Sequence, residues 1–370
     1  MEATLYKQYH PKLKRFTEKR DLTSLSNLEK WCKKMCIAFD SDILNQNSDS
    51  NETLHWLINT FPLILAYQGK TQEAEQFLHR AISYWSDKYI QNKQSQNLVH
   101  LIDPTINLLR LYKLTNQKPA FQSLMNEIAI IANQDRANLG GITVNEEILG
   151  EQWHTLYAAT LDELLKFYIL ESNFSEVLKL KAIIPEKLKN SDVYLEAKVT
   201  ALIGLGEYEA VIQLCWQQIN KTTCIKNGVY SFRLYEAFMG MEKINKANTV
   251  MKHLISTMEK TPLDSLLLLT FSSNLIEIEK LPPSSYLVKK TLKKYIEIND
   301  EFNYGMTLCN LQDNYPSELN KIKINELYKK TDYIALVKRI EKTIKIKEIK
   351  ETNNYLERIN SYLNDFLLRS

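Results

Sequence analysis

Apolar residues recur at helical spacing through most of the chain. The clearest stripe follows the i, i+3, i+4, i+7 rhythm of a helix with one buried face and consists of Leu54, Leu57, Ile58, Phe61 and Leu65. Gly69 comes just after this stripe, where a left-handed residue often ends a helix. Because no alternating pattern of convincing strand length occurs in the sequence, we predict an all-α fold class.

Three turns in the centre of the chain occur at nearly regular intervals. They are Ser172–Phe174, Gly206–Tyr208 and Glu242–Ile244, and their last residues are 34 and then 36 positions apart. Each turn separates two helical patterns, so this region is predicted to form consecutive helical hairpins. A period of roughly 34 residues is that of tetratricopeptide repeats.

The second helix of each hairpin resembles that of a tetratricopeptide repeat, in which small residues let two helices approach and a large residue fills the groove. This spacing occurs as Ala74, Leu78 and Ala81, and again as Ala247, Met251 and Leu254. Two other copies depart from it, because Lys181 and Gln218 occupy apolar positions. The resemblance extends from Glu52 to Met258. It implies a right-handed α-solenoid of helical hairpins, a tetratricopeptide-like superhelix with a concave binding face.

The patterns divide the chain into three predicted regions. These are an N-terminal helical segment at 1–45, tetratricopeptide-like helical repeats at 46–260, and C-terminal helical repeats with capping helices at 261–370. A polar break at Ser41–Asn51 separates the first two regions. In the third region we expect helices at 263–279, 284–298, 302–311, 317–330, 332–347 and 352–368.

Composition supports helices over sheets. Glycine supplies 9 of the 370 residues, well below its average share of roughly 7%, so residues for tight strand turns and phosphate loops are scarce. A chain of this length exceeds the roughly 250–300 residues at which one globular core stops growing. The net charge of +3 is much smaller than the positive charge typical of nucleic-acid-binding proteins, so we do not expect nucleic acid as a partner.

Cysteine usage and hydropathy predict a cytoplasmic protein without a membrane segment. The five cysteines are an odd number and widely spread: Cys32, Cys36, Cys215, Cys224 and Cys309. No stretch reaches the roughly 18 apolar residues of a membrane helix, and the N-terminus lacks a signal-like apolar run. Cys32 and Cys36 share a helix face without further zinc ligands nearby, so we expect buried thiols there.

Two Glu-x-x-His pairs suggest an alternative in metal chemistry. Glu52 with His55, and Glu151 with His154, each place a carboxylate and an imidazole on one helix face. Such pairs hold di-iron centres in helical bundles, so these four residues could serve a metal-dependent enzyme. The simpler interpretation is that both glutamates favour a helix start, and we expect no cofactor.

Signatures of other chemistry are incomplete. Gly69-Lys70-Thr71 matches the end of a phosphate loop, but the helical stripe before it favours a helix cap. Gly140-Gly141 lies in the polar stretch Asn133–Asn145, for which we expect a flexible connector. No complete hydrolase or nucleotide-binding motif is present.

Basic residues are concentrated between Lys321 and Lys350, with ten Lys or Arg against four acids. This stripe could follow a phosphate backbone or an acidic protein. A solvated outer helix face is the interpretation we favour for it.

If the turns are placed correctly, the inward positions of the first helices form a polar, slightly acidic groove. Its predicted residues are Asp162, Glu163, Lys166, Glu196, Thr200, Phe232, Arg233 and Glu236. Co-chaperone tetratricopeptide domains resemble this architecture and bind a C-terminal carboxylate with Lys and Asn, but acids occupy those positions here. We therefore expect a basic or polar peptide as the guest.

The function predicted is a protein- or peptide-binding scaffold or adaptor. The alternatives are the metal-dependent enzyme and a peptide-sensing regulator, which would act on another protein because no DNA-reading helix-turn-helix precedes the repeats. The sequence leaves the partner and the oligomeric state open.

Overall fold

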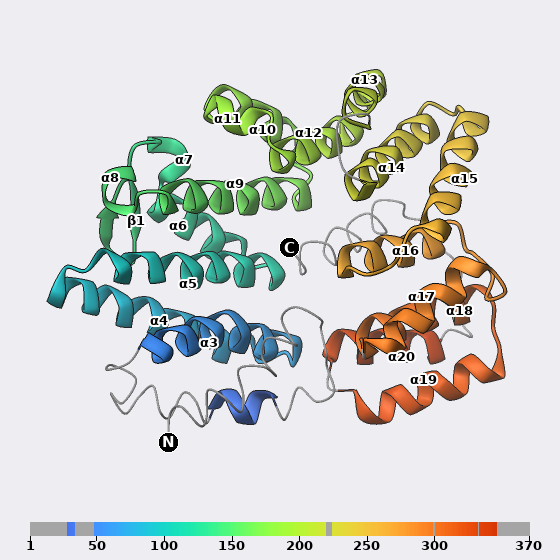
Figure 1. Cartoon of the computed structure of the whole chain (residues 1–370), viewed down its shortest axis with the longest axis horizontal. Helices are drawn as coiled ribbons and strands as arrows, with labels where there is room; N and C mark the ends of the chain where they lie inside the picture. Colours follow the sequence, from blue (N-terminus) through green and yellow to red (C-terminus); the bar gives the residue numbers. More distant parts are fainter. Residues whose placement is uncertain (1–27, 34–47, 220–223, 299, 332, 346–370) are drawn as a thin grey trace. The chain divides into compact units, whose positions relative to one another are not determined.

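A computed structural model describes residues 28–33, 48–219, 224–298, 300–331 and 333–345, with the side chains of 48–56, 224–227, 266–267 and 345 outside the description. The predicted all-α fold class is confirmed, since these residues form helices and one two-stranded sheet (Figure 1). The predicted N-terminal segment 1–45 lies outside the described residues except for a helical turn at 28–33, and the predicted helix 352–368 lies outside them entirely.

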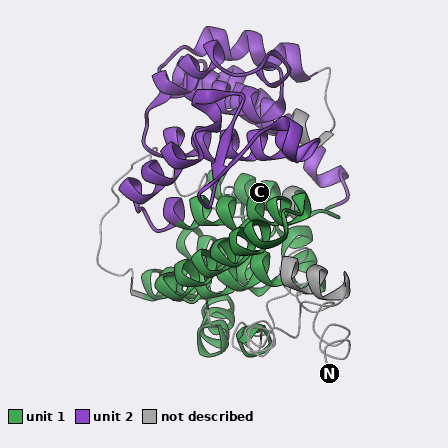
Figure 2. Ribbon diagram, turned by 90° about the vertical axis from the view of Figure 1, so that its left-hand side faces the viewer, with its two compact units in different colours: residues 1–111, 263–353 green, residues 112–262, 354–370 purple. Residues whose placement is uncertain are grey.

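The chain divides into two compact units, one of residues 1–111 and 263–353 and one of residues 112–262 and 354–370 (Figure 2). Unit 1 contains α3 (Ser48–Tyr67), α4 (Thr71–Asn92), most of α5 (Ser95–Leu114), α16 (Leu266–Ile278), α17 (Tyr286–Glu297), α18 (Glu301–Asn314), α19 (Glu318–Lys330) and α20 (Ile334–Lys345). Unit 2 contains α6 (Lys118–Ile128), α7 (Ile130–Asn133), β1 (Ala137–Leu139), β2 (Ile142–Val144), α8 (Glu146–Leu149), α9 (Gln152–Leu170), α10 (Phe174–Lys179), η2 (Leu180–Ala182), α11 (Glu186–Lys189), α12 (Asp192–Gly204), α13 (Tyr208–Ile219), α14 (Cys224–Gly240) and α15 (Ile244–Lys260). The boundaries at 45 and 260 remain predictions.

Within the described residues, six helix pairs are joined by the same type of turn. In each, a left-handed residue with φ between 47° and 76° ends the first helix, and these residues are Gly69, Asn116, Ser172, Gly206, Glu242 and Lys280. The next N–H donates to the carbonyl five residues earlier, at 2.8 or 2.9 Å. This pattern is the Schellman motif, which satisfies the last carbonyls of a helix. The predicted turns and the helix cap at Gly69 are confirmed.

Successive hairpins of unit 2 pack through a repeated contact between an aromatic ring and a glycine. A Cβ added to Gly204 would lie 2.3 Å from the ring of Phe174, and one added to Gly240 would lie 2.2 Å from the ring of Tyr208. Each ring belongs to the first residue of a second helix, and each glycine ends the first helix of the next hairpin. Only glycine permits this close approach.

The apolar spacing of the second helices is also confirmed. All six residues of the two regular copies, Ala74, Leu78, Ala81, Ala247, Met251 and Leu254, are buried. Lys181 is exposed, because α10 ends at Lys179 and leaves it beyond the packed helix.

In unit 1, α18 is the central helix and packs against α16, α17, α19 and α20. An aromatic cluster joins segments that are distant in sequence: the Tyr67 ring lies 5.3 Å from that of Tyr333 and 6.3 Å from that of Phe302. The end of α3 therefore packs against helices from the other end of the chain.

The expectation of a flexible connector at Gly140-Gly141 is wrong. These glycines, with φ of 56° and 81°, form the turn of an antiparallel hairpin in which Ala137 pairs with Val144. Each strand has three residues, too few for a strand pattern to stand out in the sequence. Positive φ at both turn residues suits a two-residue hairpin.

Candidate functional site

The eight predicted groove residues lie on α9, α12 and α14, which are the first helices of consecutive hairpins in unit 2. α12 packs against both α9 and α14, so the residues belong to adjoining helices. Glu163, Thr200 and Glu236 occupy equivalent positions, 37 and then 36 residues apart. We call these eight residues the polar face of unit 2.

On α9, the acids of the polar face are paired with lysines. The carboxylate of Glu163, with 1% of its side chain exposed, forms an ion pair with the Lys113 amine from the end of α5. Asp162 and Lys166 form a second pair at 2.8 Å, one turn apart on the same helix. Burial lowers the pKa of Lys113, and the nearby Lys166 adds to this effect, while the Glu163 carboxylate opposes it. A buried charge of this kind is tolerated only with a partner.

On α12 and α14, the polar groups bond within their own helix. Thr200 donates its hydroxyl to the carbonyl of Glu196 at 2.9 Å. Arg233 forms an ion pair with Glu236 at 2.7 Å, and 2% of the Glu236 side chain is exposed. The Phe232 ring stacks near Tyr235, with 5.8 Å between centroids.

The polar face is more enclosed and closer to neutral than the sequence predicted. Of its members, Asp162, Glu196 and Arg233 are half-buried and the other five are buried. Lys113, which the sequence analysis missed, neutralises one of the acids. The residues therefore hold fixed, partly desolvated positions.

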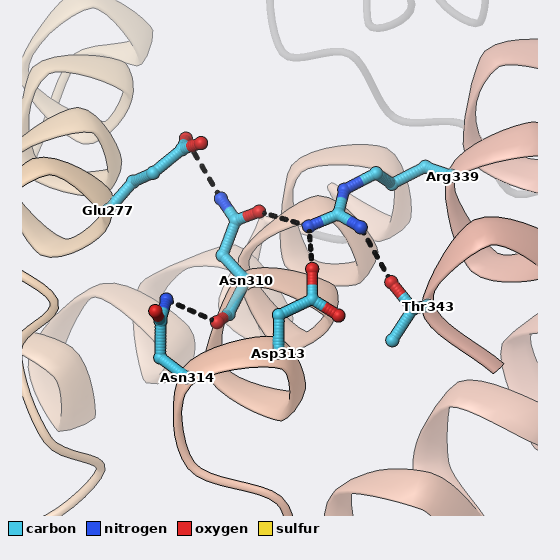
Figure 3. A network of polar contacts seen from close by, with 6 residues as sticks. All are labelled: Glu277, Asn310, Asp313, Asn314, Arg339 and Thr343. Atoms are coloured by element: carbon cyan, nitrogen blue, oxygen red, sulfur yellow. Dashed lines mark hydrogen bonds and ion pairs between the residues drawn. The ribbon is translucent and has the colours of Figure 1, made fainter. Parts of the chain in front are cut away.

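A second polar network links α16, α18 and α20 of unit 1 (Figure 3). Arg339 of α20 donates to Asn310 of α18 at 2.7 Å and to Thr343 at 2.6 Å, and it pairs with Asp313. The other end of the Asn310 amide donates to Glu277 of α16 at 2.9 Å. A single asparagine thus links three packed helices.

A smaller network joins α3 and α5 in the same unit. Asn59 donates to Asp103 at 3.1 Å and accepts from Asn107 at 2.7 Å. Arg110 donates to Asn107 at 3.2 Å. The polar residues of α5 follow an i, i+4, i+7 spacing within an apolar helix, so the sequence did contain a signal for this network.

The structure brings no metal centre together among the described residues, where no group of three or more His, Cys, Asp and Glu converges. His154 lies 3.4 Å from Glu146, and about two thirds of each side chain is exposed. Glu151 precedes α9 and is exposed. Glu52 and His55 belong to α3, but their side chains lie outside the described residues, so the metal alternative stays untested for that pair.

Cys32 is buried, Cys215 and Cys309 are buried free thiols, and the side chains of Cys36 and Cys224 lie outside the described residues. Burial raises the pKa of Cys215 to about 12, an effect that Arg233 partly opposes. A thiol with so high a pKa is a weak nucleophile at neutral pH. These cysteines therefore belong to the helix cores.

None of the described helices is both long and apolar enough to cross a membrane. The chain matches no family model, no curated protein and no solved structure.

Proposed function

We propose that the chain is a tetratricopeptide-like α-solenoid that binds a peptide or protein segment along the polar face of unit 2, as a scaffold or adaptor. The observation that supports this proposal is the arrangement of polar side chains on consecutive first helices. The same first helices also pack against the second helices in an apolar cluster, where Val199, Val211, Leu234 and Ala247 are buried.

The polar face has the properties of a recognition surface. Five of its charged groups are held by ion pairs before any partner arrives, so binding costs these side chains little ordering. The polar face, together with Lys113, contains four acids and three bases. The excess of one negative charge favours a polar or weakly basic guest over an acidic one.

We place this activity in the cytoplasm, because Cys215 and Cys309 are free thiols and reducing compartments keep thiols unpaired.

Selection from a displayed random peptide library tests the function. The wild-type chain is compared with Asp162→Lys plus Glu196→Lys, which reverses two half-buried charges of the polar face. The matched control is Glu207→Lys plus Glu209→Lys, which makes the same charge change at two exposed positions at the start of α13.

We expect the wild type and the control to enrich the same polar or basic sequences, with about tenfold weaker binding to the polar-face variant. Enrichment of one identical set by all three proteins would refute the proposal, as would no enrichment by the wild type.

A further inference from the structure

The helical turn at 28–33 is docked on the first hairpin of unit 1. Leu28, Glu29 and Cys32 of this turn are 4%, 7% and 0% exposed, so one side of it is covered. The neighbouring Lys30 and Lys33 are exposed. Because a helix of one or two turns is not stable by itself in water, the shape of this segment depends on the surface that receives it.

The Glu29 carboxylate is held by Lys70, which lies between the left-handed Gly69 and the start of α4. The Lys70 amine donates to both carboxylate oxygens, at 2.7 Å each. Lys33, one turn after Glu29, lies 2.6 Å from the same carboxylate. Burial raises the pKa of Glu29, but the hydrogen bonds and charges of Lys33 and Lys70 outweigh this effect and keep the pKa below its usual value. Lys70, the lysine of the incomplete phosphate-loop motif, thus binds a carboxylate.

A second charge pair sets the orientation of the docked turn. The Lys33 amine lies 3.9 Å from the Glu73 carboxylate in the first turn of α4, and 52% of each side chain is exposed. The docked turn therefore presents Glu29 and then Lys33, and the hairpin presents a base and then an acid. The two surfaces are electrostatically complementary in this orientation, whereas the reverse orientation would place like charges together. We call the surface formed by Lys70 and Glu73 the docking site of unit 1.

We propose that the docking site of unit 1 binds a short helical motif of a partner protein, and that residues 28–33 occupy it in cis until the partner displaces them. The motif has the pattern apolar-Glu-x-x-apolar-Lys, which Leu28, Glu29, Cys32 and Lys33 present here. The chain's own turn shows which contacts the guest makes. The site belongs to unit 1 and binds a carboxylate, so the proposal goes beyond the proposed function and does not rest on it.

The cis contact is of a kind that a partner can replace. In the described residues, the turn brings two buried apolar side chains and one buried carboxylate to the hairpin. The Lys70 side chain is 37% exposed even with the turn in place, so water can solvate its charge when the turn leaves. A tethered segment acts at an effective concentration of about a millimolar for a short linker. A partner that makes the same contacts and adds others outside the turn can exceed this competition.

The test titrates the full chain, in reducing buffer, with fluorescent peptides of residues 24–37, and anisotropy reports binding. One peptide has the wild-type sequence and the other carries Glu29→Lys. The wild-type chain is compared with two chains in which like charges release the chain's own turn, Glu29→Lys and Lys70→Glu. The matched control adds Lys93→Glu, at the exposed end of α4, to the Glu29→Lys chain.

The two released chains should prefer opposite peptides. We expect the Glu29→Lys chain to bind the wild-type peptide saturably and at least about tenfold more tightly than the Glu29→Lys peptide, and the Lys70→Glu chain to show the reverse order. The wild-type chain should bind the wild-type peptide at least about tenfold more weakly than the Glu29→Lys chain does, because its own turn competes. The Lys93→Glu control should change the affinity by no more than about twofold.

Several results would overturn the proposal. These are no saturable binding by either released chain, equal binding of the two peptides, and displacement of the peptide by inorganic phosphate at millimolar concentration. Unfolding of both released chains, followed by circular dichroism, would show that the turn is a fixed part of the fold. A wild-type dimer that is lost in Lys70→Glu, measured by light scattering, would assign the site to a second copy of the chain. A failure here leaves the library selection on unit 2 unaffected.

Discussion

Two buried tyrosines show how differently the two units hold their helices together. Tyr230 of α14 in unit 2 and Tyr295 of α17 in unit 1 are 0% and 1% exposed. The Tyr230 hydroxyl has no hydrogen-bond partner among the described residues, whereas the Tyr295 hydroxyl bonds to Ser273 at 2.7 Å and donates to the Leu269 carbonyl at 3.1 Å. Tyr230 thus contributes only packing, whereas Tyr295 also links its helix to α16 by hydrogen bonds.

The difference extends to the surroundings of each tyrosine. Tyr230 belongs to an apolar cluster with Val199, Val211 and Cys215, and equivalent tyrosines at 157 and 194 also have buried hydroxyls without a partner in the described residues. Around Tyr295, by contrast, the hydroxyls of Ser272 and Thr291 lie 2.6 Å apart. Unit 2 repeats an apolar fit from hairpin to hairpin, whereas α16 and α17 of unit 1 are joined by particular hydrogen bonds.

The largest expected effect concerns a buried ion pair of unit 2, that of Lys113 and Glu163. Lys113→Met removes this cation from a buried carboxylate, so we expect a loss of about 3–5 kcal/mol in the free energy of unfolding. Urea denaturation of the full chain measures it. Adding Glu163→Leu should restore most of the loss, and a double variant as unstable as the single one would contradict the pairing.

Gly240→Ala tests the repeated ring-on-glycine contact. Alanine favours a helix by about 1 kcal/mol over glycine, yet its Cβ would collide with the Tyr208 ring. We expect a net loss of about 1–3 kcal/mol. Gly305→Ala in unit 1 is the comparison, because its Cβ would meet methyl groups of Leu336 at 2.8 and 2.9 Å, which move more easily than a ring. An equal or larger loss at Gly305 would break the comparison between the units.

Tyr295→Phe tests the hydrogen-bonded tyrosine of unit 1. The substitution leaves the ring in place but removes the hydroxyl shared with Ser273 and Leu269, so stability should fall by about 1–2 kcal/mol. Thermal and urea unfolding both measure this loss. Unchanged stability would mean that the hydroxyl network is not a source of stability.

Tyr230→Phe is the matching change in unit 2, and its expected effect is much smaller. Removing a buried hydroxyl without a partner should leave stability within about 0.5 kcal/mol of the wild type, or raise it. The same unfolding assay serves both tyrosines. A loss as large as that of Tyr295→Phe would show that Tyr230 has a polar partner of its own.

We expect the Cys215 thiol to make the free energy of unfolding depend on pH in alkaline solution but not at neutral pH. Burial raises the thiol pKa from 9.0 to about 12, so the folded chain keeps a proton that the unfolded chain releases. The stability due to the neutral thiol is complete below pH 9 and is lost as pH rises towards 12. Cys215→Val should flatten this alkaline decline in urea unfolding. An unchanged pH profile would contradict the prediction.

The sequence predicted the features that depend on local spacing. Helices, left-handed turns and the small-residue positions of the second helices arise from contacts within a few residues, so their pattern is visible along the chain. The eight predicted groove residues lie on the first helices of consecutive hairpins, but the sequence did not predict how their charges are paired. Glu163 meets Lys113 across 50 positions, and no local pattern pairs them.

The features that were missed depend on individual long-range contacts. The Arg339 network joins α16, α18 and α20 through single side chains without any repeat. The hairpin at Gly140-Gly141 has strands of three residues, too short for a strand pattern in the sequence. Its signal in the sequence was the glycine pair, because two adjacent residues with positive φ are typical of a two-residue hairpin turn.

Hydrogen exchange of the full chain, with and without the peptide enriched in the library selection, tests the central claim most directly. The account predicts that the peptide slows amide exchange in α9, α12 and α14 while α10, α13 and α15 exchange as before. Protection confined to the second helices, or to α19 and α20, would contradict binding at the polar face of unit 2.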